Sequence, residues 1–584
     1  MSSAQQQTIE SNRAKLIPII KTIVFCGIHN MPLRGKTDET AAIFNSLLKF
    51  RVDAGDTILN DHLKNSAANA TYTSHRIQNE LINICNEVLL EHIIKDVKES
   101  QFFSVIADES CDISGIEQLS LGVRFVHKMS TGKFCVREEF LGFVPLQRLD
   151  AETISEQILS TLIKFGLDLS KMIGQAYDGC STMAGKISGV RKRIEDKYPN
   201  ANFFHCNFHK LNLVINDLSD VSEIRNTVGT IKDSINFFRE SPLRRKYIPN
   251  IPLFCETRWT AKYKSIRIFK ENINIILEAL QKLSESDVNR NTKNRAFQLY
   301  NSCSNSTFLV CLFVMAEYSS MLEPVANVLQ GVNQNLLTVK KQITTLTQIF
   351  QKHRESADAT FNVLWGKMES SLAESDIKIT IPRIVKKQIY RANVLADCAE
   401  SYFKINIFIR YVDSLILSLK ERFSEENEVP YSIFQLLPEY MSKLDENQYR
   451  SLTEKISKKY SSFLDNFAAE SMIWYDNCSN IQKSQDVLDI LKESEIFYPS
   501  VFSAICIDIS FPATTCTAER SFSTLRRVKT WIRSTMTNER LDALCMMNIH
   551  KSTIIDLISN NKYYEEIVDS FERDVRRLQF LFEN

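Results

Sequence analysis

The sequence predicts an α/β protein in which a mixed-sheet core is interrupted by a large all-α insertion and preceded by a helical segment. Three observations support this fold class. Short β-branched and aromatic runs cluster after residue 101, helical periodicity dominates residues 221–490, and strand-like character returns afterwards. We therefore expect an N-terminal helical region (1–100), a first part of the core (101–220), an insertion (221–490) and the end of the core (491–584).

The first half of the chain carries the elements of the predicted core. Helical patterns cover residues 14–100, and LINICNEVLLEHIIKDVK is the clearest of them. Three strand-like runs follow at the spacing of a meander, FFSVIAD, LSLGVRFVH and REEFLGFVPL. A helix (AETISEQILSTLIKFGL), a strand (KMIGQAYDG), a helix (VRKRIEDKY) and a strand (NFFHC) complete the order. Ribonuclease-H-like nucleotidyl-transfer cores have this order, so we expect that fold by analogy.

The second half reads as helical before the core resumes. Residues 221–490 contain long amphipathic patterns such as IRIFKENINIILEALQKL, without a repeat of fixed period. This favours a helical insertion over a helical repeat array. The run YPSVFSAICIDISFPA is predicted to be the strand at which the core resumes, ending near Pro512 before the last helices.

Composition limits the classes of protein that this chain can represent. With 584 residues, 44% hydrophobic, it can bury a large core, and its net charge of +1 provides no global attraction for polyanions. The 14 cysteines include no CxxC pair, which favours free thiols in a reducing compartment. We find no signal-peptide pattern, no zinc-finger spacing and no uninterrupted apolar span long enough for a membrane helix. We therefore expect no membrane association, and sequence-specific DNA reading is unsupported.

Three acidic residues are the candidate catalytic group. Asp108 ends the run FFSVIAD, Asp178 follows KMIGQAY, and Glu519 opens the helical pattern AERSFSTLRRV. A carboxylate at the end of a buried strand is costly to desolvate unless it meets a cation or a donor. Together, three carboxylates can hold two divalent metals for phosphodiester chemistry, although each alone would more ordinarily cap a helix or face solvent. The neighbouring Glu109 and Asp112 are interpreted as solvated or capping groups.

Several motifs resemble those of a known family. GQAYDGCSTMAGKISGVRKRI, FHCNFHKLNLVI, ETRWTAKY and TTCTAERSFSTLRRVKTWIRSTMTNERLDALCMMNIH occur in the order found in hAT-superfamily transposases. ADESCDIS and LRGKTDE fit the domesticated animal branch that includes the zinc finger MYM-type proteins. The resemblance implies a nuclear, DNA-binding protein with a C-terminal dimerisation region, although we find no zinc finger of the kind such proteins often carry near the N-terminus. The expected DNA partner is either transposon ends or non-specific DNA. It leaves two functions open, an active transposase and a catalytically silent dimerising transcriptional regulator.

The resemblance also implies roles for individual residues. Asp108, Asp178 and Glu519 match the catalytic triad of the family, which would use Mg²⁺ or Mn²⁺ to cut and transfer DNA strands. His209, in the motif Cys206-x-x-His209, matches a histidine beside the active site. The alternative for that motif is a buried cysteine followed by a hydrogen-bonded histidine at the start of a helix, because no second ligand pair supports structural zinc.

Candidate DNA contacts come from the motif ETRWTAKY and from the Glu519 helix. The resemblance implies that Trp259 stacks where a flipped base leaves the duplex, with Arg258 and Lys262 close enough to meet phosphates. The alternative is that this tryptophan packs in a core. Arg526 shares a helix face with Glu519 by i, i+7 spacing, so we expect it near the metals and the DNA.

The basic clusters and the apolar C-terminal segment each have a structural explanation beside the functional one. The basic clusters at 191–193, 243–246 and 525–533 can bind phosphates, or they can be solvated helix faces. The apolar segment LDALCMMNIHKSTIIDLI, in the region implied to dimerise, needs a covering surface, from a second subunit or from the same chain. The resemblance implies a homodimer or higher homo-oligomer.

Overall fold

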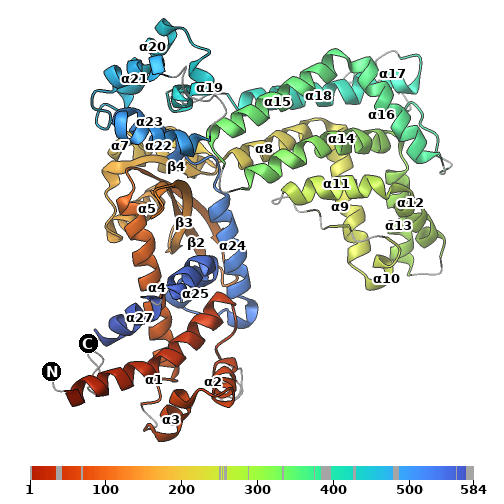
Figure 1. The fold of residues 1–584 in the computed structure, drawn as a ribbon. Coiled ribbons are helices and arrows are strands. Elements are labelled where there is room, and N and C mark those ends of the chain that lie inside the picture. Colours follow the sequence, from red (N-terminus) through yellow and green to blue (C-terminus); the bar gives the residue numbers. More distant parts are fainter. Residues whose placement is uncertain are drawn as a thin grey trace. The chain divides into compact units, whose positions relative to one another are not determined.

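The structure is a computed structural model, and it describes most of the chain in two compact units (Figure 1). The described residues are 3–34, 42–67, 70–248, 251–252, 254, 259–286, 289–331, 334–373, 375, 377–382, 396–424, 429–477, 486–560 and 562–573. The first unit, here called the sheet unit, combines Met1–Cys206 with Asn427–Asn584. The second, the helical unit, is Asn207–Glu426.

A five-stranded mixed sheet is the centre of the sheet unit. Its strands are β1 (Phe103–Cys111), β2 (Glu117–Lys128), β3 (Phe134–Leu146), β4 (Met172–Tyr177) and β5 (Asn202–His205). The spatial order is β3-β2-β1-β4-β5; the β1–β2 and β2–β3 pairs are antiparallel, and the β1–β4 and β4–β5 pairs are parallel. The predicted meander, followed by two strands after helical crossovers, is confirmed.

Helices from both ends of the chain pack around this sheet. The first group is α1 (Ser3–Ile28), α2 (Ile43–Asp53), α3 (Thr57–Asn65), α4 (His75–Glu99), α5 (Ala151–Lys164), α6 (Ser181–Ala184) and α7 (Val190–Lys197). The second group is α19 (Pro438–Met441), α20 (Glu446–Lys459), α21 (Phe467–Asn477), α22 (Val487–Phe497), α23 (Pro499–Ser510), α24 (Cys516–Val528), α25 (Asn538–Ile549), α26 (Lys551–Ser559) and α27 (Lys562–Glu572).

The N-terminal and C-terminal helices lie side by side. Helix α1 contacts α25 and α27, so that the two ends of the chain share one core (Figure 1). The approach is close at Gly27, where an added Cβ would lie 2.5 Å from Cε of Met547. Helices α1–α4 lie in the predicted N-terminal helical region, and they belong to the same unit as the sheet.

The predicted strand YPSVFSAICIDISFPA is wrong, because this segment forms helix α23. Pro499 occupies the first helical turn, where its missing N–H and fixed φ are tolerated. Val501, Ile505 and Ile509 are all buried, along with residues on other faces of the helix. A helix that is buried nearly all round has no polar face, so its sequence has the same continuous apolar pattern as a buried strand.

The helical unit contains no strand among its described residues. Its helices are α8 (Asn207–Asp217), α9 (Ser222–Arg239), α10 (Pro242–Arg245), α11 (Trp259–Glu271), α12 (Ile273–Glu285), α13 (Arg290–Cys303), α14 (Ser306–Leu329), α15 (Leu336–Glu355), α16 (Ala357–Leu372), α17 (Ala399–Phe403) and α18 (Arg410–Arg422). The unit ends at Glu426, whereas the sequence places the end of the insertion at residue 490. Helices α20 and α21 have helical periodicity but pack in the sheet unit, because periodicity predicts a helix and not the unit in which that helix packs.

Helix α14 is long and apolar enough to cross a membrane, which corrects the sequence reading that no such span exists. Buried residues follow one another along it without a polar stripe, including Leu309, Phe313 and Leu322. Of its most apolar window, 72% is buried inside the protein. Burial of this extent is what the central helix of a helical core requires.

Candidate functional site

Asp108 and Asp178 come from adjacent parallel strands. In the β1–β4 register, Ile106 lies opposite Ala176. Continuing both chains by two residues brings Asp108 level with Asp178, which directly follows β4. The backbone N–H of Cys180 donates to Oδ1 of Asp178 at 3.1 Å, so this carboxylate also shapes the turn after the strand. Strand pairing therefore explains why two residues 70 positions apart lie together.

Helix α24 brings Glu519 to the same face of the sheet. Ser120 of β2 lies opposite Asp108, so the two side chains project from one face. The Ser120 hydroxyl lies 2.8 Å from the hydroxyl of Ser521, a residue of α24. Glu519 is two residues earlier, in the first turn of this helix. The serine pair therefore fixes the start of α24 beside the carboxylates.

Cys206 attaches the start of α24 to the end of the sheet. Its backbone N–H donates to the Tyr177 carbonyl at 3.1 Å. Its thiol accepts from the backbone N–H of Thr515, the residue before α24, at 3.2 Å. Cys206 is 1% exposed, so the buried-cysteine alternative holds for the first residue of the Cys206-x-x-His209 motif.

The carboxylates are close enough to affect one another's protonation. Burial raises the pKa of Asp108, and the charges of Glu519, Glu109 and Asp178 raise it further. Burial, together with Asp178 and Glu117, raises the pKa of Glu109 to about 7. Like charges gathered in this way disfavour ionisation unless a cation joins them. Glu109 is therefore a fourth member of the acidic cluster and not the solvated group predicted from the sequence.

The chemistry of this cluster fits a divalent metal, although the side chains do not form a closed site. Among the residues that the structure describes, no three His, Cys, Asp or Glu side chains are grouped closely enough to hold an ion. The donors are all carboxylate oxygens, which Mg²⁺ and Mn²⁺ favour, and Asp108, Asp178 and Glu519 are each only half-buried. Holding an ion here requires the side chains to close around it.

A buried ion pair attaches the other end of α24 to the sheet. Nζ of Lys529, just after α24, lies 2.6 Å from Oδ2 of Asp112, and their side chains are 1% and 0% exposed. Asp112 also accepts from the backbone N–H groups of Ser114 and Ile116, which caps the turn after β1. Asp112 therefore has the capping role that was one of its two predicted roles, and it also forms an ion pair with Lys529 that the sequence did not predict.

Of the other predicted site residues, His209 and Lys262 belong to the helical unit. His209 is a half-buried residue in the first turn of α8, in the helical unit. Arg258 and the side chain of Trp259 lie outside the described residues. Lys262 is 4% exposed, and its Nζ lies 5.8 Å from the centre of the Phe254 ring, so its ammonium is not presented to a phosphate.

The basic clusters differ in their surroundings. In the first, Lys192 pairs with Asp196, and Arg193 lies 3.7 Å from Glu152, so the solvated-face alternative holds. In the third, Arg526 is exposed. Its position in the last turn of α24 is two helical turns from Glu519.

The apolar residues of α25 are covered within the chain. Leu541, Ala543, Leu544, Cys545, Met546 and Met547 are all buried in the core shared with α1 and α4. Burial within the same chain, one of the two alternatives for this segment, therefore accounts for this face.

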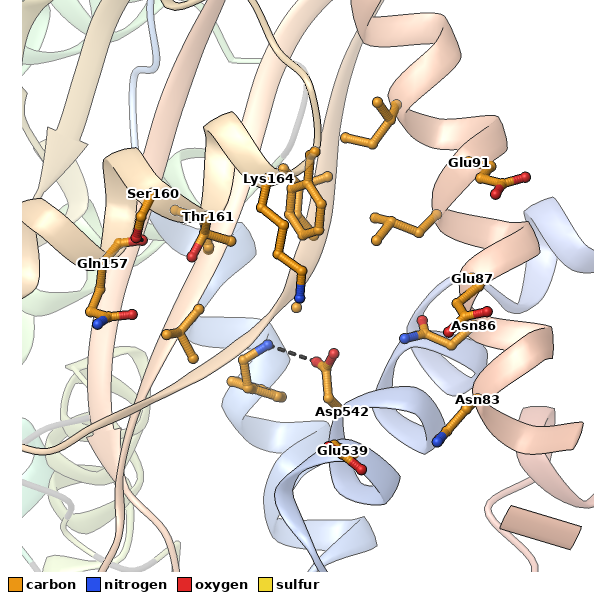
Figure 2. Close-up of a pocket in the computed structure, with 18 of the residues that line it drawn as sticks. Asn83, Asn86, Glu87, Glu91, Gln157, Ser160, Thr161, Lys164, Glu539 and Asp542 are labelled. Atoms are coloured by element: carbon orange, nitrogen blue, oxygen red, sulfur yellow. Dashed lines mark hydrogen bonds between the residues drawn. The ribbon is translucent and has the colours of Figure 1, made fainter. Parts of the chain in front are cut away.

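A cavity of about 1220 Å³ lies elsewhere in the sheet unit, between α4, α5, α25 and the edge strand β3 (Figure 2). None of the three predicted catalytic acids lines it. In Figure 2, Lys164 points from α5 toward Asp542, which accepts from the backbone N–H of Phe143 at 2.7 Å. Burial raises the pKa of Asp542 to about 7. Gly142, which precedes Phe143 on β3, lies at a bulge with φ +139°, a conformation that favours glycine.

Two family models match the chain, at its two ends. Residues 1–189 match the ZMYM1/FAM200 RNase-like domain, and residues 463–551 match the hAT family C-terminal dimerisation region. Both matched regions lie within the sheet unit, which holds Asp108, Asp178 and Glu519.

Two curated relatives match along most of the chain. The 52 kDa repressor of the inhibitor of the protein kinase of Homo sapiens is 26% identical over 578 residues, covering 93% of this chain and 74% of the relative. Its Mus musculus counterpart is 26% identical over 581 residues, covering 93% and 75%. With matches to an RNase-like domain at one end and to a hAT dimerisation region at the other, this chain resembles the hAT transposase-derived proteins.

Proposed function

We propose that this chain is a nuclear DNA-binding protein with a ribonuclease-H-like core that cuts and transfers DNA strands with Mg²⁺ or Mn²⁺. The observation that carries this proposal is the placement of the acids, since Asp108 and Asp178 lie level at the ends of adjacent strands and α24, which carries Glu519, contacts the sheet through Ser120 and Ser521. These residues are separated by up to 411 positions in the chain.

The proposed roles follow from the elements that position each residue. Asp108, Asp178 and Glu519 would hold the metal ions, which supply Lewis-acid activation of the phosphate and a metal-bound nucleophile. The strand ends fix two of the carboxylates, and the Ser120–Ser521 contact fixes the helix that carries the third. His209 would orient groups beside the site. Arg526 and the pair of Arg258 and Trp259 would contact DNA.

A second candidate function is a catalytically silent regulator that self-associates through its C-terminal region. Both curated relatives are named as repressors, and the hAT dimerisation region is matched. In this reading the fold provides DNA binding and dimer formation, and the acids are inherited without use. The two functions differ in whether metal binding leads to cleavage.

The deciding experiment measures metal binding and strand cleavage on the same full-length protein. Calorimetric titration with Mn²⁺ would compare wild type with Asp178→Asn and Glu519→Gln, and with Glu446→Gln as an exposed-carboxylate control on α20. A cleavage assay would use supercoiled plasmid and duplexes that carry the terminal inverted repeats of the cognate transposon. Sedimentation would report self-association.

The first function predicts Mn²⁺ binding and DNA nicking in wild type and in Glu446→Gln, with both lost in the two site variants. Because each carboxylate would contact the metal, we expect cleavage to fall at least 100-fold in either variant, about 2.7 kcal/mol. Mn²⁺ binding without nicking supports the regulator. Absence of Mn²⁺ binding in wild type contradicts the catalytic proposal.

A further inference from the structure

Three arginines distant in sequence gather at one place on the sheet unit. Arg34 follows α1, Arg533 lies in the turn after α24, and Arg540 lies in the first turn of α25. Arg34 donates to Oδ1 of Asn79 at 2.7 Å, and Arg540 donates to the same oxygen. Two guanidinium groups are thus bound to one atom of α4.

These arginines have only neutral partners within the described part of the chain. Arg533 donates to Oδ1 of Asn30 at 3.2 Å and to the Val528 carbonyl at 3.3 Å. Arg34 also approaches the His75 carbonyl at 3.4 Å. Amide and carbonyl oxygens satisfy N–H donors, but they do not neutralise charge. By contrast, other arginines of this unit, such as Arg137 and Arg450, pair with carboxylates.

The gathered charge affects the ionisation of Arg540. Burial, together with the charges of Arg34 and Arg533, lowers the pKa of Arg540 to about 10. A protein that places cations together without carboxylates has a local positive potential although its net charge is only +1. Such a potential favours an anion with several oxygens, and guanidinium forks match the oxygens of a phosphate.

The surroundings indicate which phosphate-bearing ligand this site would take. Trp531, two residues before Arg533, is 73% exposed, and the adjacent Ile532 is 55% exposed. An exposed indole beside arginines is typical of nucleic-acid surfaces. Arg533 follows the last turn of α24, and Glu519, in the first turn of that helix, lies about 14 Å from the end of the helix along its axis. That length corresponds to about four base pairs of a duplex.

We propose that Arg34, Arg533 and Arg540 form a phosphate-binding site for the backbone of DNA that extends from the acidic cluster. The identification of the anion as DNA rests on the proposed function, whereas the site itself rests on the convergence of the arginines. Contacts of this kind fix the position of a duplex without reading its sequence.

The test measures how strongly duplex binding depends on salt. Full-length protein would be titrated with a fluorescent duplex of arbitrary sequence in EDTA, over about 50 to 200 mM NaCl. The variant is Arg34→Gln/Arg533→Gln/Arg540→Gln. The matched control, Arg148→Gln/Arg193→Gln/Arg450→Gln, removes three charges from the same unit, but its arginines face carboxylates. Thermal unfolding checks each fold, and Arg34→Gln alone, at an exposed position, serves if the triple variant does not fold.

We expect the triple variant to bind at least tenfold more weakly and to reduce the slope of log K against log [salt] by about 2 to 3, because each lost phosphate contact contributes about 0.9. For Arg34→Gln alone we expect a reduction of about 0.9. An unchanged slope, or an equal loss in the matched control, overturns the proposal. Tight arginine-dependent binding of pyrophosphate without binding of duplex also overturns the assignment to DNA. Because EDTA prevents cleavage, this result is independent of the acidic cluster.

Discussion

Replacing Lys529 with methionine tests whether the buried ion pair with Asp112 holds α24 against the sheet. Methionine keeps most of the side-chain length and volume but removes the ammonium. In the native protein, burial acts to raise the pKa of Asp112, but hydrogen bonds from Lys529 and Gln118 outweigh it and lower the pKa. The substitution leaves the carboxylate buried with three donors, from Ser114, Ile116 and Gln118.

The expected loss of stability follows from this geometry. Breaking a buried pair costs about 3–5 kcal/mol, and the three remaining donors place Lys529→Met near about 3 kcal/mol. In Asp112→Asn/Lys529→Met no buried charge remains, so we expect a loss of about 1 kcal/mol. The double variant should therefore be about 2 kcal/mol more stable than Lys529→Met alone.

The pH dependence has a defined sign. In wild type the lowered pKa of Asp112 contributes stability above the unfolded value near 4, and this contribution is lost at lower pH. In Lys529→Met the folded pKa of Asp112 rises above the unfolded value, so that variant loses stability as pH increases through it. The difference between the two proteins should therefore be larger at neutral pH than in acid.

Hydrogen exchange provides the assay, because it reports on the sheet unit separately from the helical unit. Exchange of β1 and β2 amides and the denaturant midpoint would be measured for both variants, with Lys455→Met as an exposed-lysine control. We expect the control to change stability by less than about 0.5 kcal/mol. A loss below about 1 kcal/mol in Lys529→Met, or a double variant no more stable than the single, would refute the reasoning.

Two further substitutions test other parts of the sheet unit. Asp542→Asn keeps an oxygen for the N–H of Phe143 and removes a carboxyl whose pKa is raised to about 7. The stability that this carboxyl contributes to the wild type is present below pH 4 and is lost as pH rises through 7, so the variant should be more stable than wild type above pH 7, by at most about 4 kcal/mol, and equally stable in acid. Thermal unfolding of both proteins in acid and above pH 7 tests this, and an equal difference at both pH values would contradict it. Gly179→Ala places a Cβ 2.3 Å from the His205 ring, so we expect the free energy of unfolding to fall by about 1–3 kcal/mol and Mn²⁺ to bind more weakly next to Asp178. A variant with the stability and the Mn²⁺ affinity of the wild type would contradict this expectation.

Patterns within short windows of the sequence predicted the elements of the sheet correctly. β-Branched and aromatic runs identified all five strands, because strand preference and alternation are local properties. The positions of Asp108 and Asp178 at strand ends were readable for the same reason. Glu519 required the family motif, since its separation from the other acids gives no local signal.

Local patterns failed where burial depends on distant partners. Helix α23 was taken for a strand because a helix covered on nearly every side has no polar face to reveal its period. The end of the helical unit was misplaced because α20 and α21 have ordinary helical patterns, and only their packing assigns them to the sheet unit. Glu109 was interpreted as a solvated group because Asp178, whose charge raises its pKa, is distant in the sequence.

By itself, the sequence determined the elements of the sheet, the family resemblance and the three acids that carry the proposed chemistry. Only the tertiary structure decided which charges meet, pairing Asp112 with Lys529 across 417 residues and placing Arg34 beside Arg533 and Arg540. The physical reason is that secondary structure follows from side chains a few residues apart, whereas electrostatic interactions depend on distances in space. Those distances are set when the two ends of the chain pack into one core.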